Sequence, residues 1–446
     1  MSWKKVKLGE LLTESRIPCD NPNPDRRIKV KLKVLGVEKR GLENEIEGAT
    51  KQFIRKAGQF IYGKQNFHKG AFGIIPDELD GFESSADLPA FDVSDKCLPE
   101  WIFYYFKQGN YYLELSKIAR GVATQRIHPE QIYDLEIPLP DLNTQKNVLH
   151  KINSLEENGT TISTELTYQI TLVKKLRQQL LQDAVQGKLV EQNPKDEPAS
   201  ELLKKIKKQK HTLIKQKKLK IGRATEQSVS LISDLEIPKT WQWCKSDEIF
   251  FVTKLAGFEY SEHISLKESG EIPVVRAQNV RPLNIDKTNL LYIDAKTSSY
   301  LERCALTKKC LLVTFIGAGI GDVATFEETE RWHLAPNVAK MEPFEGCEEF
   351  INVKYLNYYL MSKLGQREIF KHVKATAQPS LSMGTIRDID FAIPPLAEQN
   401  RIVQKLDELM QYCNELEASI KQSESQNEKL LQQVLREALR KEPVEV

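Results

Sequence analysis

The part of the chain that most resembles a cofactor-binding motif is a glycine turn, TFIGAGIG, at residues 314–321. Its F-x-G-x-G spacing is the form of a loop that binds S-adenosylmethionine. Such a loop follows a strand and opens a helix whose N-terminus faces the ligand. Here β-branched and aromatic residues resume at Val323, which predicts a strand, a tight turn and a second strand. We therefore predict that Gly317, Gly319 and Gly321 permit a tight turn or a close backbone approach and carry no chemistry.

Other motifs that would make the chain an enzyme are missing from the sequence. The tetrapeptides NPPF and DPPY, which hold a flipped adenine in DNA methyltransferases, do not occur, and neither does a Walker A motif or a clear nuclease cluster of carboxylates and lysine. The seven cysteines include no C-x-x-C pair, and the seven histidines show no ligand spacing with them. We therefore expect no catalytic residue, no metal site and no cofactor in this chain.

The composition is that of a globular protein with more than one domain. Hydrophobic residues make up 40% and charged residues 28% of the 446 positions, and this length favours two or three domains. The longest nearly unbroken apolar stretch, residues 310–320, is too short to cross a membrane. The opening residues, MSWKKVKLGELL, lack the apolar segment of a signal peptide. We expect a cytoplasmic protein with no membrane partner.

An internal repeat organises the chain. Residues 134–155 match residues 388–409 at a constant offset of 254, and the same offset aligns the helical residues that follow without a gap. Gln145, for example, recurs as Gln399. Self-similarity that keeps one register over roughly fifty residues predicts two copies of one plan, a globular domain followed by a long helix.

Each copy ends in a helix with a narrow apolar seam, because apolar residues recur there at alternating spacings of three and four. The residues expected to pack the two helices together are Ile152, Leu155, Leu166, Leu176, Leu180, Leu406, Leu409, Leu416, Ile420, Leu430 and Val434. Gly187 is the expected stop of the first helix. A helix over residues 143–186 would be about 66 Å long at roughly 1.5 Å per residue. We predict that the two helices form an antiparallel intramolecular coiled coil.

Charge is distributed unevenly along the chain. Residues 204–223 carry ten Lys or Arg and no acidic residue, so the rest of the chain is net negative although the total is +2. A protein that held DNA alone would usually show a strongly basic face, so we expect partners to supply much of any grip on DNA. The basic run itself is predicted to be the solvated face of a helix in a linker rather than a DNA-binding arm.

The openings of the two long helices resemble a known family. IPLPDLNTQKNVLHKI, from Ile137, and IPPLAEQNRIVQKLDEL, from Ile393, resemble the conserved regions of Type I restriction-modification specificity subunits, whose usual form is IPLPPLxEQxxIV. LLQDAVQGKLVEQNPKDEPASELLKKIK and IPKTWQWCKSDEI resemble the family's central region and the entry to its second domain. The family plan covers nearly the whole chain. One departure is at Asn143 and Thr144, where the commoner form has PLxEQ.

The resemblance implies an α+β fold with a pseudo-twofold internal repeat. Two globular target-recognition domains, residues 1–140 and 236–395, would be separated by two long antiparallel coiled-coil helices, residues 141–187 and 396–446. Residues 188–235 would form a basic linker. The implied function is recognition of an asymmetric, bipartite site in double-stranded DNA within a restriction system that defends against phage. The implied partners are two modification subunits, which bind S-adenosylmethionine and methylate adenine, and motor-nuclease subunits, which use ATP and Mg²⁺.

Polar loop residues in both domains resemble the target-reading loops of this family, and their donors and acceptors suit base edges and phosphates. In the first domain the expected DNA-binding residues are Lys64, Gln65, Asn66, His68, Arg120, Thr124, Gln125 and Arg126. In the second domain they are Arg276, Gln278, Asn279, Arg281, Asn337, Lys374, Thr376, Gln378 and Ser380. For each residue taken singly, a solvated position in a loop explains its type as well as a role in DNA binding does. Residue type does not identify the base that is read.

Two other functions remain open at this level. The chain would be a methyltransferase if the glycine turn opened a helix. A coiled-coil scaffold with two protein-binding domains would show the same helical seams, because periodicity does not identify what the domains bind. Only the family resemblance and the polar loops favour DNA.

Overall fold

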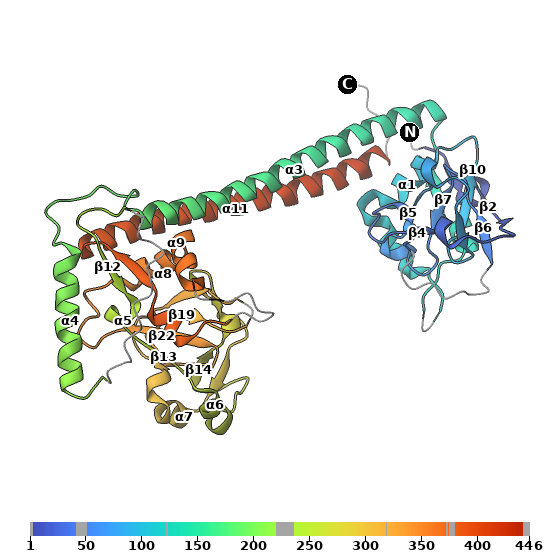
Figure 1. Cartoon of the computed structure of the whole chain (residues 1–446). Coiled ribbons are helices and arrows are strands. Elements are labelled where there is room, and N and C mark those ends of the chain that lie inside the picture. Colours follow the sequence, from blue (N-terminus) through green and yellow to red (C-terminus); the bar gives the residue numbers. More distant parts are fainter. Residues whose placement is uncertain are drawn as a thin grey trace. The chain divides into compact units, whose positions relative to one another are not determined.

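The structure is a computed structural model that describes residues 3–41, 51–121, 124–219, 236–317, 319–371, 373 and 380–439. It divides into two compact units, Met1–Gln169 with Ser419–Val446, and Ile170–Ala418. Each unit holds one globular domain and part of the two long helices, α3 (Leu142–Val185) and α11 (Leu396–Ala438), which Figure 1 shows. Helices and strands are mixed in both units, so the predicted α+β class is confirmed.

The first unit is built on an antiparallel sheet of four strands in the order β2-β10-β7-β8. These strands are β2 (Leu12–Ser15), β7 (Phe60–Tyr62), β8 (Phe72–Ile74) and β10 (Ala90–Val93). The smaller sheets contain β1 (Lys5–Lys7) with β11 (Glu136–Pro138), β4 (Ile28–Val30) with β5 (Val37–Lys39), and β3 (Ile17–Pro18), β6 (Gln52–Ile54) and β9 (Glu83–Ser85). The helices of the domain are α1 (Pro99–Lys107) and α2 (Pro129–Tyr133). Aromatic side chains fill the core, where the buried rings of Phe67 and Phe106 lie 4.9 Å apart.

The second unit repeats this plan and enlarges it. Its main sheet has the order β13-β22-β19-β20, formed by β13 (Phe250–Lys254), β19 (Cys310–Thr314), β20 (Val323–Phe326) and β22 (Val338–Pro343). The pair β12 (Gln242–Lys245) and β23 (Asp390–Ile393) corresponds to β1 and β11. A further sheet, β17-β14-β21-β18, contains β14 (Ile272–Val275), β17 (Leu291–Ile293), β18 (Ala305–Leu306) and β21 (Trp332–Leu334), and β15 (Val280–Arg281) pairs with β16 (Asn284–Ile285). The helices are α4 (Ala199–Lys215), α5 (Ser246–Ile249), α6 (Gly257–His263), α7 (Ala295–Tyr300), α8 (Val353–Met361), α9 (Lys363–Phe370) and α10 (Met383–Arg387).

The repeated glutamine fastens each domain to its long helix in the same way. Gln145 Oε1 accepts a hydrogen bond from the backbone N–H of Leu98 (2.9 Å), and Gln145 Nε2 donates to the carbonyl oxygen of Pro140 (2.9 Å). Gln399 makes the same two bonds, at 2.8 and 3.0 Å, with the residues 254 positions further along. Both glutamine side chains are fully buried. The internal repeat predicted from the sequence is therefore present in the hydrogen bonding as well.

The departure from the family pattern at the start of α3 has a local reason. Asp141 lies before the first turn and accepts hydrogen bonds from the backbone N–H (3.0 Å) and the hydroxyl (2.8 Å) of Thr144, which satisfies a free helix-end donor. Glu398 of α11 is the counterpart of Thr144, and Glu398 Oε1 accepts a hydrogen bond from the indole N–H of Trp241 at 3.0 Å. Thr144 thus belongs to a helix cap, whereas Glu398 anchors an aromatic side chain.

The two long helices run antiparallel in each unit. In the second unit Arg177 of α3 pairs with Glu417 of α11 at 2.5 Å, whereas Ala184, later in α3, lies in the same core as Leu406, earlier in α11. In the first unit the carbonyl oxygen of Gly159 accepts from the Asn427 side chain at 3.1 Å. Helix α3 ends two residues before Gly187, whose positive φ of 70° confirms the predicted helix stop.

The buried stripe of α3 keeps the predicted alternation of three and four but not every predicted residue. Its buried and half-buried members are Ile152, Glu156, Gly159, Ser163, Leu166, Ile170, Val173, Arg177, Leu180 and Ala184. Leu155 and Leu176 were predicted to pack but are 37% and 44% exposed, and Leu416 and Leu430 of α11 are 50% and 60% exposed. These four predictions were wrong. The other predicted packing residues of α11, namely Leu406, Leu409, Ile420 and Val434, are buried or half-buried.

Polar residues hold the places that the exposed leucines were predicted to take. Glu156 accepts from Tyr104 Oη at 3.0 Å and pairs with Lys107 Nζ at 2.5 Å. Arg177 pairs with Glu417 and donates to the Asn414 side chain at 2.7 Å. A polar side chain is tolerated in a packed stripe when its hydrogen bonds are satisfied, and those partners come from distant parts of the sequence.

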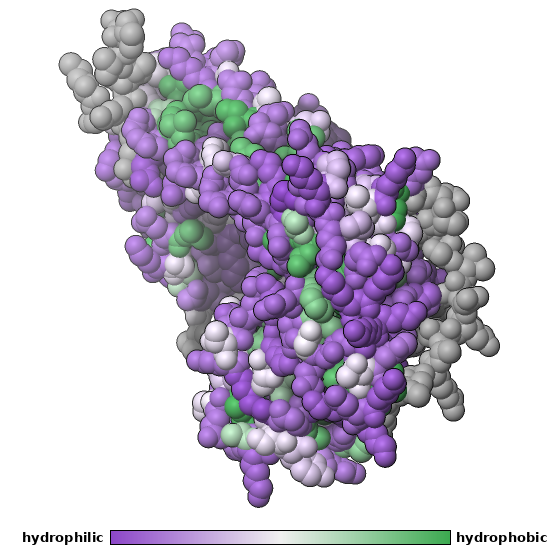
Figure 2. All heavy atoms as spheres, turned by 90° about the vertical axis from the view of Figure 1, so that its left-hand side faces the viewer, coloured by the Kyte–Doolittle hydropathy of each residue, from purple (hydrophilic) through white to green (hydrophobic). Residues whose placement is uncertain are grey.

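Helix α4 lies within the stretch that was predicted to be a basic linker. Its apolar face is not solvated, because Leu202, Ile206 and Leu213 are buried in the core of the second unit. Its cationic face is exposed or half-buried, as predicted, and Lys204, Lys207, Lys208, His211, Thr212 and Lys215 line a surface groove of about 420 Å³. The helix therefore belongs to the second unit rather than to a free linker. Figure 2 shows the face on which it lies, where hydrophilic residues predominate and hydrophobic ones form small separate groups.

Candidate nucleic-acid interface

The loop between β7 and β8 presents the predicted polar residues of the first unit. The backbone N–H of Gly63 donates to the carbonyl oxygen of Ala71 at 2.9 Å, and this bond closes the loop. Phe67 anchors its middle, because this buried ring stacks on Tyr62 at a centroid distance of 4.7 Å. Lys64, Gln65, Asn66 and His68 are half-buried around this anchor. Burial and then the Lys69 charge lower the pKa of His68 from its usual value, so this imidazole is neutral at neutral pH.

Backbone hydrogen bonds bring a second predicted segment to this loop. Arg120 and Arg126 exchange two backbone bonds of 2.8 Å, and the N–H of Ile127 donates to the carbonyl of Lys64 at 2.8 Å. The N–H of Lys64 donates in turn to the carbonyl of Asp87 at 3.0 Å. Arg120, Thr124 and Gln125 are exposed and Arg126 is half-buried. All eight residues predicted for the first domain therefore lie on adjoining loops, which we call the first candidate surface.

Two further lysines belong to the first candidate surface and were missed by the sequence reasoning. The backbone N–H of Lys33 donates to the carbonyl of Lys69 at 2.9 Å, and both side chains are exposed. Lys33 and the residue after it have positive φ values of 56° and 58°, a conformation that neither residue type signals in a sequence. Their charges add to a surface that already carries several cations, which suits a phosphate backbone.

The glycine turn of the second unit is a hairpin loop. Strands β19 and β20 pair antiparallel from Cys310 with Phe326 to Val313 with Val323, so the predicted order of strand, turn and strand is confirmed. Gly317, the first glycine of the turn, has a φ of 97°. A cofactor loop would need a helix at Val323, and β20 begins there instead.

The glycine turn occupies the place that the loop after β7 occupies in the first unit. The N–H of Leu381 donates to the carbonyl of Phe315 at 2.9 Å, as Ile127 does to Lys64. The N–H of Phe315 donates to the carbonyl of Asn337 at 3.1 Å, as Lys64 does to Asp87. Ile316 forms an isolated β-bridge with Ser380, and we call these adjoining residues, with Lys254, the second candidate surface. The sequence reasoning missed the glycine turn as part of this surface because the turn was judged only as a cofactor motif.

Seven of the nine residues predicted for the second domain divide into three groups, and the remaining two, Arg276 and Asn279, have structural partners. Asn337 and Ser380 lie on the second candidate surface and are exposed. Gln278 and Arg281 are exposed at the β15–β16 hairpin, and that hairpin contacts β20 through the bond from the N–H of Leu283 to the carbonyl of Val323 at 2.9 Å. Lys374, Thr376 and Gln378 lie outside the described residues.

Asn279 and Arg276 have structural partners. The Asn279 side chain is 1% exposed, accepts from the N–H of Arg276 at 3.1 Å and donates to the carbonyl of Asp286 at 3.0 Å. This amide is therefore used inside the hairpin and cannot reach a base, so its prediction as a DNA-binding residue was wrong. The Arg276 guanidinium donates to the carbonyl of Asn289 at 2.6 Å and is half-buried.

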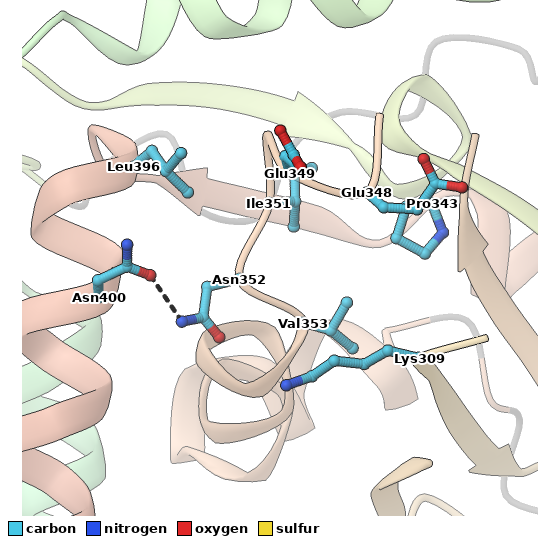
Figure 3. A pocket seen from close by; sticks show the side chains of 9 residues that line it. All are labelled: Lys309, Pro343, Glu348, Glu349, Ile351, Asn352, Val353, Leu396 and Asn400. Carbon is cyan, nitrogen blue, oxygen red and sulfur yellow. Dashed lines mark hydrogen bonds between the residues drawn. The ribbon is translucent and has the colours of Figure 1, made fainter. Parts of the chain in front are cut away.

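A pocket of about 240 Å³ lies where α8 begins beside α11, and Figure 3 shows the residues around it. Lys309, Pro343, Glu348, Glu349, Ile351, Asn352, Val353, Leu396 and Asn400 line it. Asn352 Nδ2 donates to Asn400 Oδ1 at 2.9 Å across the pocket, and Asn352 Oδ1 caps α8 by accepting from the N–H of Lys354 at 3.0 Å. Its asparagines thus join two helices. In the described ranges, no group of three or more His, Cys, Asp and Glu side chains is arranged for a metal ion.

Comparison with known proteins assigns the chain to a family. The family model for the Type I restriction modification DNA specificity domain matches residues 1–172 and 238–423, which is most of the chain. The chain belongs to this family. In the described residues of this Type I specificity chain, the first matched segment contains one four-stranded sheet and the second contains two, and each segment contains one candidate surface. No helix in the described part of the chain combines the length and hydrophobicity that a membrane crossing needs.

Curated relatives of this specificity chain carry matching names. The chain is 28% identical over 280 residues to the Type I restriction enzyme EcoAI specificity subunit of Escherichia coli, a match that covers 60% of this chain and 46% of that protein. It is 21% identical over 340 residues to the EcoBI specificity subunit of the same species, covering 76% of this chain and 65% of that protein. The chain thus spans between about half and two thirds of the length of these relatives.

Solved structures share the fold of this specificity chain. A chain from a study of complex assembly and conformational transition in the type I R-M system has a TM-score of 0.61 at 17% identity, with 98% of each chain covered. The HsdS subunit from Thermoanaerobacter tengcongensis has a TM-score of 0.53 at 16% identity, with 98% of this chain and 96% of that chain covered. The predicted architecture of two domains with two long helices, present as a repeat, is confirmed.

Proposed function

We propose that the chain recognises an asymmetric, bipartite site in double-stranded DNA, one half-site per unit, and orients two adenine methyltransferase subunits and the motor-nuclease subunits on it. The observation that carries this proposal is one backbone arrangement displayed twice with different side chains. Lys64, Gln65 and Asn66 of the first unit stand where the second has residues 315–317. Base edges are read by side chains, so two different sets on one scaffold fit two different half-sites.

Exposed apolar residues of the long helices suit the methyltransferase partners. In the first unit Leu155 and Ile162 of α3 lie one heptad apart and are 37% and 47% exposed. In the second unit Leu172 and Leu176 lie one turn apart and are 42% and 44% exposed. Large apolar side chains in rows on a helix are typical of a surface that packs on another helix. We assign these rows to helices of the modification subunits.

The chemistry is assigned to the partners in this proposal. S-adenosylmethionine is bound by the modification subunits, and ATP and Mg²⁺ are bound by the motor-nuclease subunits. The hairpin geometry of the glycine turn supports this assignment, because no helix N-terminus follows it to face a cofactor. This chain contributes the position and orientation of the DNA.

A domain exchange tests the two half-sites. The chain is co-expressed with the modification subunit encoded beside it, in a host without other adenine methyltransferases, and methylated adenines are mapped across the genome. We expect one bipartite motif with unlike halves. Replacing residues 237–393 with the second domain of another family member should change one half-site and leave the other intact. A folded, complex-forming chimera that loses both specificities would contradict the proposal.

A second experiment tests where methyl transfer occurs. The purified chain alone should neither methylate nor cleave DNA, and adding the modification subunit should give methylation. Robust methyl transfer by the chain alone, abolished by Gly317→Ala, would instead make the chain a methyltransferase.

A further inference from the structure

An apolar side chain stands at the centre of the second candidate surface, where the first surface carries an amide. The matching hydrogen bonds make Phe315 the counterpart of Lys64, so Ile316 is the counterpart of Gln65. Ile316 is 42% exposed, although it follows a strand whose residues are fully buried. Its β-bridge to Ser380 ties it to the segment before α10.

The backbone around Ile316 is held in place on both sides. Phe315 is 2% exposed, and Lys254 Nζ lies 4.8 Å from the centre of its ring. After Ile316 the chain turns through Gly317, whose φ of 97° excludes most other residues although the space around it is open. A Cβ at Gly321 would lie 2.6 Å from the Phe370 ring, so the end of the turn fits closely against α9. The exposure of Ile316 is therefore set by the fold.

Two cations lie on segments next to this apolar residue. Lys254 Nζ lies over the Phe315 ring, and the exposed Arg281 is on the β15–β16 hairpin, which bonds to Val323 just after the turn. Burial raises the pKa of Asp322, and the Arg281 charge opposes that shift. An exposed apolar side chain with cations on the neighbouring segments suits a groove of DNA, where the cations meet phosphates and the apolar group meets a base.

We propose that Ile316 reads the C5 methyl group of a thymine in the major groove of the second half-site. This inference rests on the proposed function. Among base edges in the major groove, only thymine presents a methyl group, and an aliphatic side chain distinguishes it by contact and by exclusion of water. Gln65, at the equivalent place in the first unit, offers a donor and an acceptor and so reads a base by hydrogen bonds.

The test uses the complex of this chain with its modification subunit and a duplex that carries the mapped site. Each thymine of the second half-site is replaced in turn by uracil, which keeps the pairing edge and removes only the methyl group. Loss of one buried methyl group should weaken binding about fourfold at one such position. In Ile316→Ala the complex should bind thymine and uracil duplexes equally, and Ile316→Val should lie between the two.

Phe258→Ala is the matched control, because Phe258 is an apolar side chain of the same unit that is 66% exposed on α6. It should keep the full preference for thymine, and uracil in the first half-site should have the same effect in wild type and Ile316→Ala.

Three results would overturn the inference. These are a second half-site without thymine on either strand, a wild-type complex indifferent to every uracil replacement, and an Ile316→Ala complex that keeps the preference for thymine. If Ile316→Ala weakens binding equally to the thymine and uracil duplexes, and the wild-type complex is also indifferent to uracil, then the Ile316 side chain is a wedge between bases and the inference fails. A complex that binds no specific site at all would refute the proposed function, and this inference would fall with it.

Discussion

The buried glutamine that joins each domain to its long helix should be a major determinant of stability. In the second unit Gln399 Oε1 accepts from the N–H of Asn352 at 2.8 Å, and Gln399 Nε2 donates to the carbonyl of Pro394 at 3.0 Å. Gln399→Leu keeps the size of the side chain but leaves both backbone groups without a partner. An unsatisfied buried polar group costs roughly 1–3 kcal/mol, so the free energy of unfolding should fall by about 2–6 kcal/mol.

The assay is urea unfolding followed by circular dichroism, together with hydrogen exchange of the amides of α8. The matched control is Gln411→Leu, because Gln411 lies on the same helix, is exposed and donates from its side chain to the exposed Glu415 side chain one turn away. A surface change of this kind should stay within about 0.5 kcal/mol of wild type. Exchange should become faster at Asn352 and the first turn of α8 in Gln399→Leu alone. Equal stability of the two variants would refute the reasoning.

Three further predictions concern buried charge and helix length. Lys371→Met should lower the free energy of unfolding by about 3–5 kcal/mol in urea titrations. The Lys371 and Glu368 side chains are 2% and 1% exposed and pair at 2.8 Å, so the substitution leaves the Glu368 charge buried without its cation. Burial lowers the pKa of Lys371, but the hydrogen bonds and charges of Glu368 and Asp390 together outweigh burial and raise that pKa above 10.5. The stability that these ion pairs give should therefore be present below pH 10.5 and lost as the pH rises above it in wild type, whereas Lys371→Met should lack this step. Burial raises the pKa of Glu398 above 4.5, so the free energy of unfolding of wild type should fall as the pH rises from 4.5 through the raised pKa. Glu398→Gln keeps an acceptor for the Trp241 indole and should remove that fall in the same titration. We also predict that the length of the two long helices sets the spacing between the two half-sites. Inserting one heptad into each of α3 and α11 should then lengthen the DNA spacer found by methylation mapping by about three base pairs, from roughly 1.5 Å of rise per residue, and an unchanged spacer in a folded complex would contradict this prediction.

The sequence determined the repeat and the extent of the long helices, because both depend on local patterns. The offset of 254 that pairs Gln145 with Gln399 reappears as the same pair of hydrogen bonds in each unit. The predicted helix over residues 141–187 agrees closely with α3, Leu142–Val185, because a capping aspartate and a following glycine are local signals. The strand, turn and strand around the glycine turn also followed from neighbouring residues alone.

Only the tertiary structure decided which residues face a partner. Leu155 fits the heptad spacing as well as Glu156 does, and the polar residue is in the stripe because Lys107 and Tyr104, some fifty positions earlier, satisfy it. Asn279 had the right type for reading adenine but is used inside its own hairpin. The match of the glycine turn with the loop at Lys64 depends in each unit on one backbone bond that spans more than twenty residues and one that spans more than sixty, and no local pattern encodes bonds over those distances.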